Sequence, residues 1–206
     1  MILSNQISND HPITELELSK TLAMGRTPIR EALNLLSKDG IIQLIPNKGF
    51  ILRQISYEDI IQIYQIREVL DPLATRLSNE RIDLSKLEEI EEKYLRKKSD
   101  WESSRQFSQE LHSLIYKSCG NPYLIEMFES LDFRIEVKRN SAWNLWIKFN
   151  DTVVIERRKQ EHAEIIQALK EKNSEAAERM SKEHITDAIR DIIRLIIPNS
   201  VNSELK

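Results

Sequence analysis

The sequence predicts a mostly α-helical protein in two parts, a helix-turn-helix with a hairpin over residues 1–55 and an all-α antiparallel bundle over residues 56–206. Three observations lead to this fold class. Apolar residues recur at helical spacing along most of the chain. Glycine and proline are scarce, with 4 and 6 residues respectively, which argues against a loop-rich or disordered protein. Two short β-rich runs near residue 47 are the exception, and they predict one hairpin.

The composition argues against several classes of protein. Hydrophobic residues make up 40% of the chain and charged residues 31%, an ordinary globular balance. No run approaches the roughly 20 apolar residues that span a bilayer, and the first residues lack the basic and apolar segments of a signal peptide. Cys119 is the only cysteine, so no internal disulfide can form, and a cytoplasmic protein without a membrane partner is expected.

The net charge of −3 is distributed unevenly. Residues 1–55 carry six basic and five acidic side chains, which gives +1 there and leaves −4 for residues 56–206. Two domains with different partners would produce this asymmetry.

A first helix is expected from residue 14 onward, because Thr14 and Glu17 have the spacing of a capping box. Residues 23–25, Ala-Met-Gly, then interrupt the helical pattern as a tight turn. A second helix begins near Arg26, with Pro28 in the first turn, where proline removes no helical hydrogen bond. Its apolar residues repeat at i, i+3, i+4 and i+7: Ile29, Ala32, Leu33 and Leu36.

A β-hairpin is expected directly after this helix. Gly40 ends the helix in the manner of a left-handed C-terminal residue. The β-rich runs 41–45 and 50–53 flank Pro-Asn-Lys-Gly at residues 46–49, which is typical of a hairpin turn. Helix, tight turn, helix and hairpin in this order make a winged helix-turn-helix.

The second helix carries the residue types of a DNA recognition helix. Such a helix enters the major groove with its N-terminal residues facing the bases. Arg26 and Arg30 project from one face, and a bidentate contact from arginine to guanine is worth about 1–3 kcal/mol of discrimination. Thr27 can bind a phosphate, and Lys48 at the hairpin tip can reach the backbone or the minor groove. Two arginines on a helix are more often a solvated surface, but the turn, Pro28 and the hairpin favour DNA binding here.

Six helices are predicted in the second part, with no strand and no internal repeat. Clear breaks lie at residues 120–122, Gly-Asn-Pro, and at residues 172–174, Lys-Asn-Ser. The expected helices span residues 57–79, 84–98, 100–118, 122–140, 153–171 and 174–196.

Three histidines lie inside these predicted helices: His112, His162 and His184. His162 and His184 occur on consecutive antiparallel helices, so they can meet across the bundle. Three imidazoles could hold Zn²⁺, Ni²⁺ or a similar divalent metal. The alternative is that these are three unrelated histidines, each hydrogen-bonded or exposed. The spacing alone favours this alternative.

The first part resembles the GntR superfamily of bacterial regulators. Residues 25–33 read Gly-Arg-Thr-Pro-Ile-Arg-Glu-Ala-Leu, close to the family's Ser-Arg-Thr-Pro-Val-Arg-Glu-Ala-Leu. Gly40 and Asn-Lys-Gly-Phe at residues 47–50 follow in the family's order. The resemblance implies a set of DNA-contacting residues: Arg26, Thr27, Arg30, Lys48 and Gly49.

This part also departs from the family at three places. Gly25 stands where the family has serine, and Leu16 stands where many members have a DNA-contacting arginine, which implies fewer phosphate contacts. Residues 2–5 resemble the end of the family's first helix. Either translation starts upstream of Met1, or the domain does without that packing.

The second part resembles the all-helical ligand domain of the FadR branch, the FCD domain. The resemblance rests on residues 65–74, Gln-Ile-Arg-Glu-Val-Leu-Asp-Pro-Leu-Ala, and on the surroundings of the three histidines. Many FCD domains bind a divalent metal through three His and an Asp four residues before the first His. The resemblance implies His112, His162 and His184 as metal ligands. The position of the Asp is occupied by Ser108, whose hydroxyl is a far weaker ligand.

The resemblance further implies a small carboxylate effector, often bound at the metal. Arg67 and Arg134 are candidate partners of that carboxylate, and Ser108 is grouped with them as an effector-site residue. A surface salt bridge is the commoner role for either arginine.

The prediction is a homodimeric transcription regulator, by family default a repressor, that binds double-stranded DNA at an inverted-repeat operator and responds to a small organic acid. A DNA-binding regulator with a degenerate sensor, which binds neither metal nor effector, is the main alternative. A metalloenzyme is a third reading, but the sequence contains no H-E-x-x-H motif and no evident nucleophile–base pair.

Overall fold

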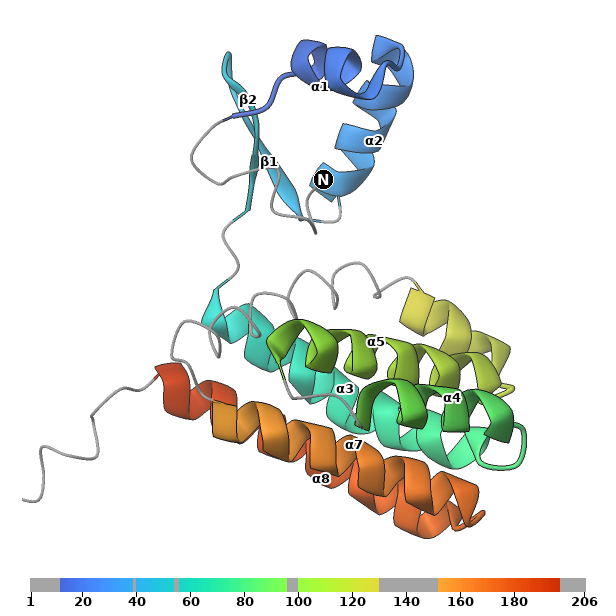
Figure 1. The fold of residues 1–206 in the computed structure, drawn as a ribbon. Helices are drawn as coiled ribbons and strands as arrows, with labels where there is room; N and C mark the ends of the chain where they lie inside the picture. The colour runs from blue at the N-terminus through green and yellow to red at the C-terminus, as the bar shows by residue number, and fades with distance from the viewer. Residues whose placement is uncertain (1–11, 39, 54–55, 96–99, 130–151, 197–206) are drawn as a thin grey trace, which may run out of the picture. The chain divides into compact units, whose positions relative to one another are not determined.

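A computed structural model describes residues 12–38, 40–53, 56–95, 100–129 and 152–196 (Figure 1). The chain divides into two compact units, residues 1–56 and residues 57–206. The predicted fold class is confirmed: a small helical unit with one hairpin is followed by an all-helical unit.

The first unit consists of two helices and a two-stranded antiparallel sheet. Helix α1 spans Glu15–Leu22 and helix α2 spans Arg26–Lys38. Strand β1, Ile42–Ile45, pairs with strand β2, Gly49–Leu52. Helix α2 packs on α1 and on β1, so the unit has the helix, turn, helix and wing order that the sequence predicts (Figure 1).

Local sequence determines where α1 begins. Thr14 is its N-cap, and the capping box is complete: the backbone N–H of Glu17 donates to Thr14 Oγ1 at 3.2 Å, and the backbone N–H of Thr14 donates to Glu17 Oε2 at 2.9 Å. The helix ends at Leu22, and its C-cap residue Ala23 has a left-handed φ of 53°. The capping box therefore directs the chain into α1 at a defined residue.

The buried side of α2 is narrower than the apolar spacing predicts. Ile29 and Leu33 are buried, but Leu36 is half-buried and Ala32 is exposed. Of the described elements, α1 and β1 pack against α2, and Ala32 remains exposed.

The wing is joined to the segment that precedes α1. Ile13 forms a β-bridge with Phe50, whose backbone N–H donates to the Ile13 carbonyl oxygen at 2.8 Å. Gly49 has a φ of +111°, and a Cβ at this position would lie 2.6 Å from that same oxygen. Glycine is therefore required at position 49 for the wing to close against the body of the unit.

The second unit is a bundle of helices (Figure 1). Helix α3 packs against α5 and α8, while α7 packs against α4, α5 and α8. Residues 122–129 are also helical, and the rest of the predicted helix 122–140 lies outside the described residues. The other elements are α3 (Tyr57–Ser78), α4 (Leu84–Leu95), α5 (Trp101–Ser118), α7 (Thr152–Lys170) and α8 (Ser174–Ile196).

The core of this unit contains apolar and polar layers. Its apolar cluster includes fully buried residues from four helices: Ala74, Leu87, Leu111, Ile166 and Leu169. Beside this cluster, α3, α5, α7 and α8 bury charged and imidazole side chains, which are described below. None of the described helices is long and apolar enough to cross a membrane.

Candidate metal centre and DNA-binding surface

Three buried histidines converge in the helical unit. His112 comes from α5, His162 from α7 and His184 from α8, and each is at most 5% exposed. One ligand nitrogen from each side chain lies within 4.8 Å of the others. The ring centroids of His162 and His184 are 4.4 Å apart, and those of His112 and His162 are 5.5 Å apart. The packing of three helices therefore gathers histidines that are far apart in the sequence.

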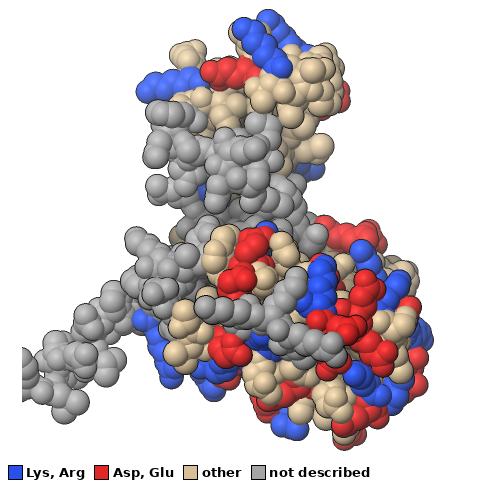
Figure 2. Space-filling view, viewed as in Figure 1, with Lys and Arg blue, Asp and Glu red and all other residues tan. Residues whose placement is uncertain are grey.

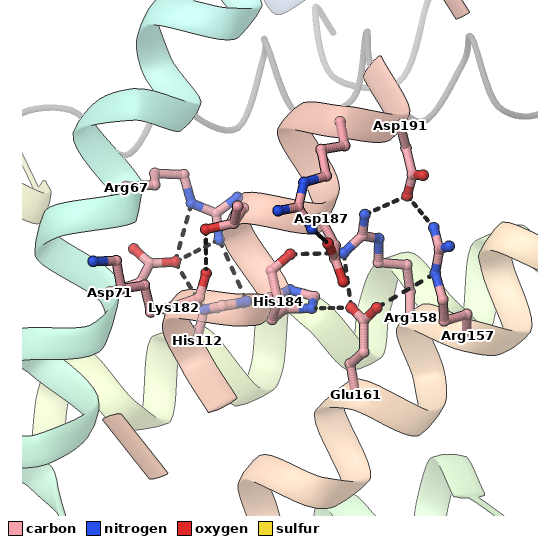
Figure 3. Close-up of polar contacts among 12 residues, drawn as sticks. Arg67, Asp71, His112, Arg157, Arg158, Glu161, Lys182, His184, Asp187 and Asp191 are labelled. Atoms are coloured by element: carbon pink, nitrogen blue, oxygen red, sulfur yellow. Dashed lines mark hydrogen bonds and ion pairs between the residues drawn. The ribbon is translucent and has the colours of Figure 1, made fainter. Parts of the chain in front are cut away.

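An ion pair from α3 lies against His112 (Figure 3). Arg67 donates from Nε and Nη2 to Asp71 Oδ2, at 3.1 and 2.7 Å. The same Oδ2 is 3.4 Å from His112 Nδ1, and Arg67 Nη2 is 3.4 Å from His112 Nε2. Tyr116 donates its hydroxyl to Asp71 Oδ1 at 2.7 Å. Asp71 is therefore a buried carboxylate with several donors around it, and it reaches one nitrogen of a candidate metal ligand.

Burial and the neighbouring charges shift the pKa values of Arg67 and Tyr116. Burial disfavours the charged form of Arg67, but the Asp71 carboxylate more than compensates, so the pKa of Arg67 lies above its ordinary value. Burial, together with Asp71, raises the pKa of Tyr116. Arg67 is therefore a permanent positive charge beside His112, balanced by Asp71.

A second ionic network holds His184 (Figure 3). Glu161 Oε2 lies 2.7 Å from His184 Nδ1. Arg158, buried between α7 and α8, donates from Nη1 to Glu161 Oε2 and to the His184 carbonyl oxygen, both at 2.7 Å. Asp191 accepts hydrogen bonds from Arg158 and Arg157. The Glu161 carboxylate is thus fixed where it can orient the His184 ring.

Burial, reinforced by the positive charges of Arg158 and Arg67, lowers the pKa of His184 well below its usual range. Burial also raises the pKa of Glu161, although Arg158 opposes the rise. His184 is therefore neutral near pH 7, which is the form that offers a nitrogen lone pair to a cation.

The donor set fits a divalent metal ion such as Zn²⁺ or Ni²⁺. Metal-bound histidines usually give their second ring nitrogen to a carboxylate or carbonyl, and both His112 and His184 have a carboxylate at Nδ1. Nitrogens on one tetrahedral zinc lie roughly 3.3 Å apart, so the histidine nitrogens, which here lie within 4.8 Å of one another, must come closer together to share one ion. Among the described residues, the candidate ligands of this group are the three histidines alone, with no carboxylate in the set.

The residues predicted for an effector site differ in where they lie and what they contact. Ser108 is buried on α5, one helical turn before His112 and on the same face. Arg67 is buried and paired with Asp71, as described above, and is not a surface salt bridge. Arg134 lies outside the described residues.

Sequence reasoning missed the charged residues that surround the histidines: Asp71, Arg158, Glu161 and Asp191. Their spacing could have indicated two of them. Arg158 precedes His162 by one helical turn, and Asp71 follows Arg67 by one turn, so each shares a helix face with a residue of the site.

The DNA-binding residues predicted in the first unit lie at its surface. Arg26, Thr27, Arg30 and Lys48 are exposed and Gly49 is half-buried. Figure 2 shows Lys and Arg side chains at the surface of this unit, with acidic side chains beside them. The N-terminal residues 26–30 of α2, which include three of the exposed residues, belong to the part of a recognition helix that meets the bases.

One acidic partner on this surface was not predicted. Arg30 donates from Nε to Glu15 Oε1 and from Nη2 to Glu15 Oε2, both at 2.8 Å. The Arg30 side chain remains 62% exposed and that of Glu15 is 27% exposed. The hydrogen bonds from Arg30 lower the pKa of Glu15, so the pair is ionised over a wide pH range.

Comparisons with known proteins agree with both units. Residues 1–52 match the family described as "Bacterial regulatory proteins, gntR family", and residues 62–187 match the FCD domain. The chain is 29% identical over 192 residues to the uncharacterised HTH-type transcriptional regulator YdhC of Bacillus subtilis (strain 168), covering 90% of this chain and 81% of that protein. It is 28% identical to the Nta operon transcriptional regulator of Aminobacter aminovorans, over 69% of this chain and 70% of that protein.

A repressor and a solved structure extend the similarity. The HTH-type transcriptional repressor GlaR of Escherichia coli (strain K12) is 23% identical, over 91% of this chain and 89% of that protein. The structure of E. coli McbR/YncC superposes with a TM-score of 0.77 at 21% identity, covering 95% of this chain and 92% of that one. At this identity, the structural likeness supports the fold.

Proposed function

The chain belongs to the GntR family of bacterial transcription regulators and carries an FCD domain, and from this premise we propose that it is a dimeric repressor whose operator binding responds to a metal and a small carboxylate. Residues 1–55 form the DNA-binding domain in this proposal, and residues 56–206 form the sensing and dimerisation domain. The family is one of regulators, so the enzyme reading of the sequence is set aside.

DNA recognition is assigned to the N-terminal residues 26–30 of α2 and to the wing. Arg26 and Arg30 contact bases, Thr27 contacts a phosphate, and Lys48 contacts the backbone beside the wing. Their exposure on a rigid helix and at a hairpin tip supports this assignment. A homodimer presents two such surfaces, which is why an inverted repeat with half-sites about one helical turn apart is the expected operator.

Sensing is assigned to the buried site in the helical unit, and the convergence of His112, His162 and His184 is the observation that carries it. When bound, the metal supplies an electrophilic centre that holds a carboxylate oxygen. Arg67 lies beside His112 and is the candidate donor of hydrogen bonds to the same carboxylate, although Asp71 already balances its charge. Ligand binding biases the dimer between arrangements that fit the two half-sites differently.

A constitutive DNA-binding protein with a degenerate sensor is the second candidate. Ser108 favours it, because a buried hydroxyl stands where a carboxylate ligand would strengthen the metal site. In that case, neither metal nor small acids change operator affinity.

Selection of binding sites from a random-sequence DNA library tests the DNA-binding part of the proposal. The full-length protein is expected to enrich inverted repeats and to protect both half-sites against nuclease cleavage. Footprints at single half-sites, or no enrichment at all, would contradict a dimeric operator-binding regulator.

A further inference from the structure

The Glu15–Arg30 pair uses a defined edge of the guanidinium group. Arginine carries its donors on Nε, Nη1 and Nη2 in a planar fork. Glu15 accepts from the edge formed by Nε and Nη2, with two parallel hydrogen bonds of 2.8 Å. The edge formed by Nη1 and the second hydrogen of Nη2 also has two parallel N–H groups, which match O6 and N7 of guanine in the major groove. A carboxylate on the first edge and a guanine on the second can be bound at the same time.

Glu15 is itself held on a rigid element. It is the first residue of α1, between the N-cap Thr14 and the capping-box residue Glu17. Its position at a helix N-terminus also favours a negative charge. Since α1 packs against α2, the carboxylate reaches Arg30 from a neighbouring helix and not from the same turn.

We infer that Glu15 is a positioning residue for base recognition: it holds the Arg30 guanidinium in the orientation that reads guanine. This inference rests on the proposed role of Arg30 in DNA binding. An unrestrained arginine is flexible and loses rotamer freedom on binding, whereas an arginine already held by Glu15 has lost part of it beforehand. In the inferred complex, this carboxylate brings negative charge toward the DNA phosphates and weakens non-specific binding, so Glu15 increases selectivity in two ways.

Three full-length variants test this inference. Glu15→Gln removes the negative charge and weakens the hydrogen bonding to the Arg30 guanidinium. Glu15→Asp keeps the charge but shortens the side chain, so that it separates geometry from charge. Glu31→Gln is the matched control, because Glu31 is exposed on α2 and its replacement removes the same charge while the Glu15–Arg30 pair stays in place.

The measurement is a ratio of affinities. Each protein is titrated with the site selected by the wild type, with the same site in which each guanine pair is replaced in turn by an adenine pair, and with unrelated DNA. The wild type is expected to lose at least 10-fold in affinity at one guanine. Glu15→Gln and Glu15→Asp are expected to reduce that discrimination about 3- to 10-fold, while Glu31→Gln leaves it unchanged. Affinity for unrelated DNA is expected to rise in both Gln variants but not in Glu15→Asp.

The outcomes separate this inference from its premise. Unchanged discrimination in Glu15→Gln overturns the positioning role while the proposed function stands. Tighter binding of Glu15→Gln than of Glu31→Gln to the selected site also overturns it, because Glu15 then masks Arg30. A wild type that discriminates no guanine overturns the proposed function and the inference together.

Discussion

Replacing Arg30 by alanine is expected to weaken operator-specific binding strongly and to leave the fold intact. One bidentate arginine–guanine contact is worth about 1–3 kcal/mol of discrimination. A dimer that reads two half-sites loses the contact twice, so specific affinity falls by about 30-fold or more. Binding to unrelated DNA depends mainly on phosphate contacts and is expected to change much less.

The structure explains why the Arg30 variant keeps its fold. The Arg30 side chain is exposed, while the core contacts of α2 come from Ile29 and Leu33. Arg179 is a matched control, since its side chain is also 62% exposed but belongs to the helical unit. Footprinting on the selected site, with circular dichroism to monitor folding, measures the effect. An Arg30→Ala footprint like that of the wild type or Arg179→Ala would rule out this recognition helix.

Replacing His162 by alanine is expected to remove the bound metal. His162 is 2% exposed and lies beside both other histidines, so its loss leaves only two imidazoles for the ion. Elemental analysis of protein purified without chelator or affinity tag is expected to give about one divalent ion per wild-type chain and under a tenth of one for the variant. His162→Gln, which fills more of the same volume, shows whether any loss of metal reflects the missing imidazole and not a cavity.

The carboxylate behind His184 provides a second, milder test of the same site. Glu161→Gln weakens the orientation of the His184 ring and is expected to lower metal affinity about 10- to 100-fold. Glu164→Gln is the control, because Glu164 is exposed on the same helix and bonds to Gln160 instead. Substoichiometric metal in the wild type and in all variants would contradict a metal site at the three histidines.

Local features of the fold were predictable from the sequence because they depend on few neighbours. Thr14 and Glu17 form the capping box expected from their spacing. Gly40, expected to end the second helix in a left-handed conformation, has a φ of +67°. Pro28 lies in the first turn of α2, where proline is tolerated.

The site was predictable only in part, because burial of polar residues depends on tertiary packing. The meeting of His162 with His184 follows from two consecutive antiparallel helices. His112 comes from a helix more distant in sequence, and the resemblance to the FCD domain was needed to include it. Charged residues on helices are usually solvated, so only its spacing from His162 could have distinguished the buried Arg158 from the exposed Arg179. The Glu15–Arg30 pair likewise depends on how α1 packs on α2.

The two units would act as one regulator only if their binding equilibria are coupled. A ligand changes operator affinity to the extent that it binds the competent and incompetent arrangements with different affinity. Such coupling typically amounts to 5- to 150-fold in affinity. The metal alone is a suitable probe, since its candidate ligands are known and the carboxylate is unidentified.

The most direct test is therefore the affinity for the selected DNA site before metal removal, after removal by a chelator, and after metal is restored, with His162→Ala measured in parallel. Wild-type affinity is expected to change at least about 5-fold on metal removal and to return with the metal, while the His162→Ala affinity stays constant throughout. Equal wild-type affinity in all three states would contradict control of DNA binding by the histidine site.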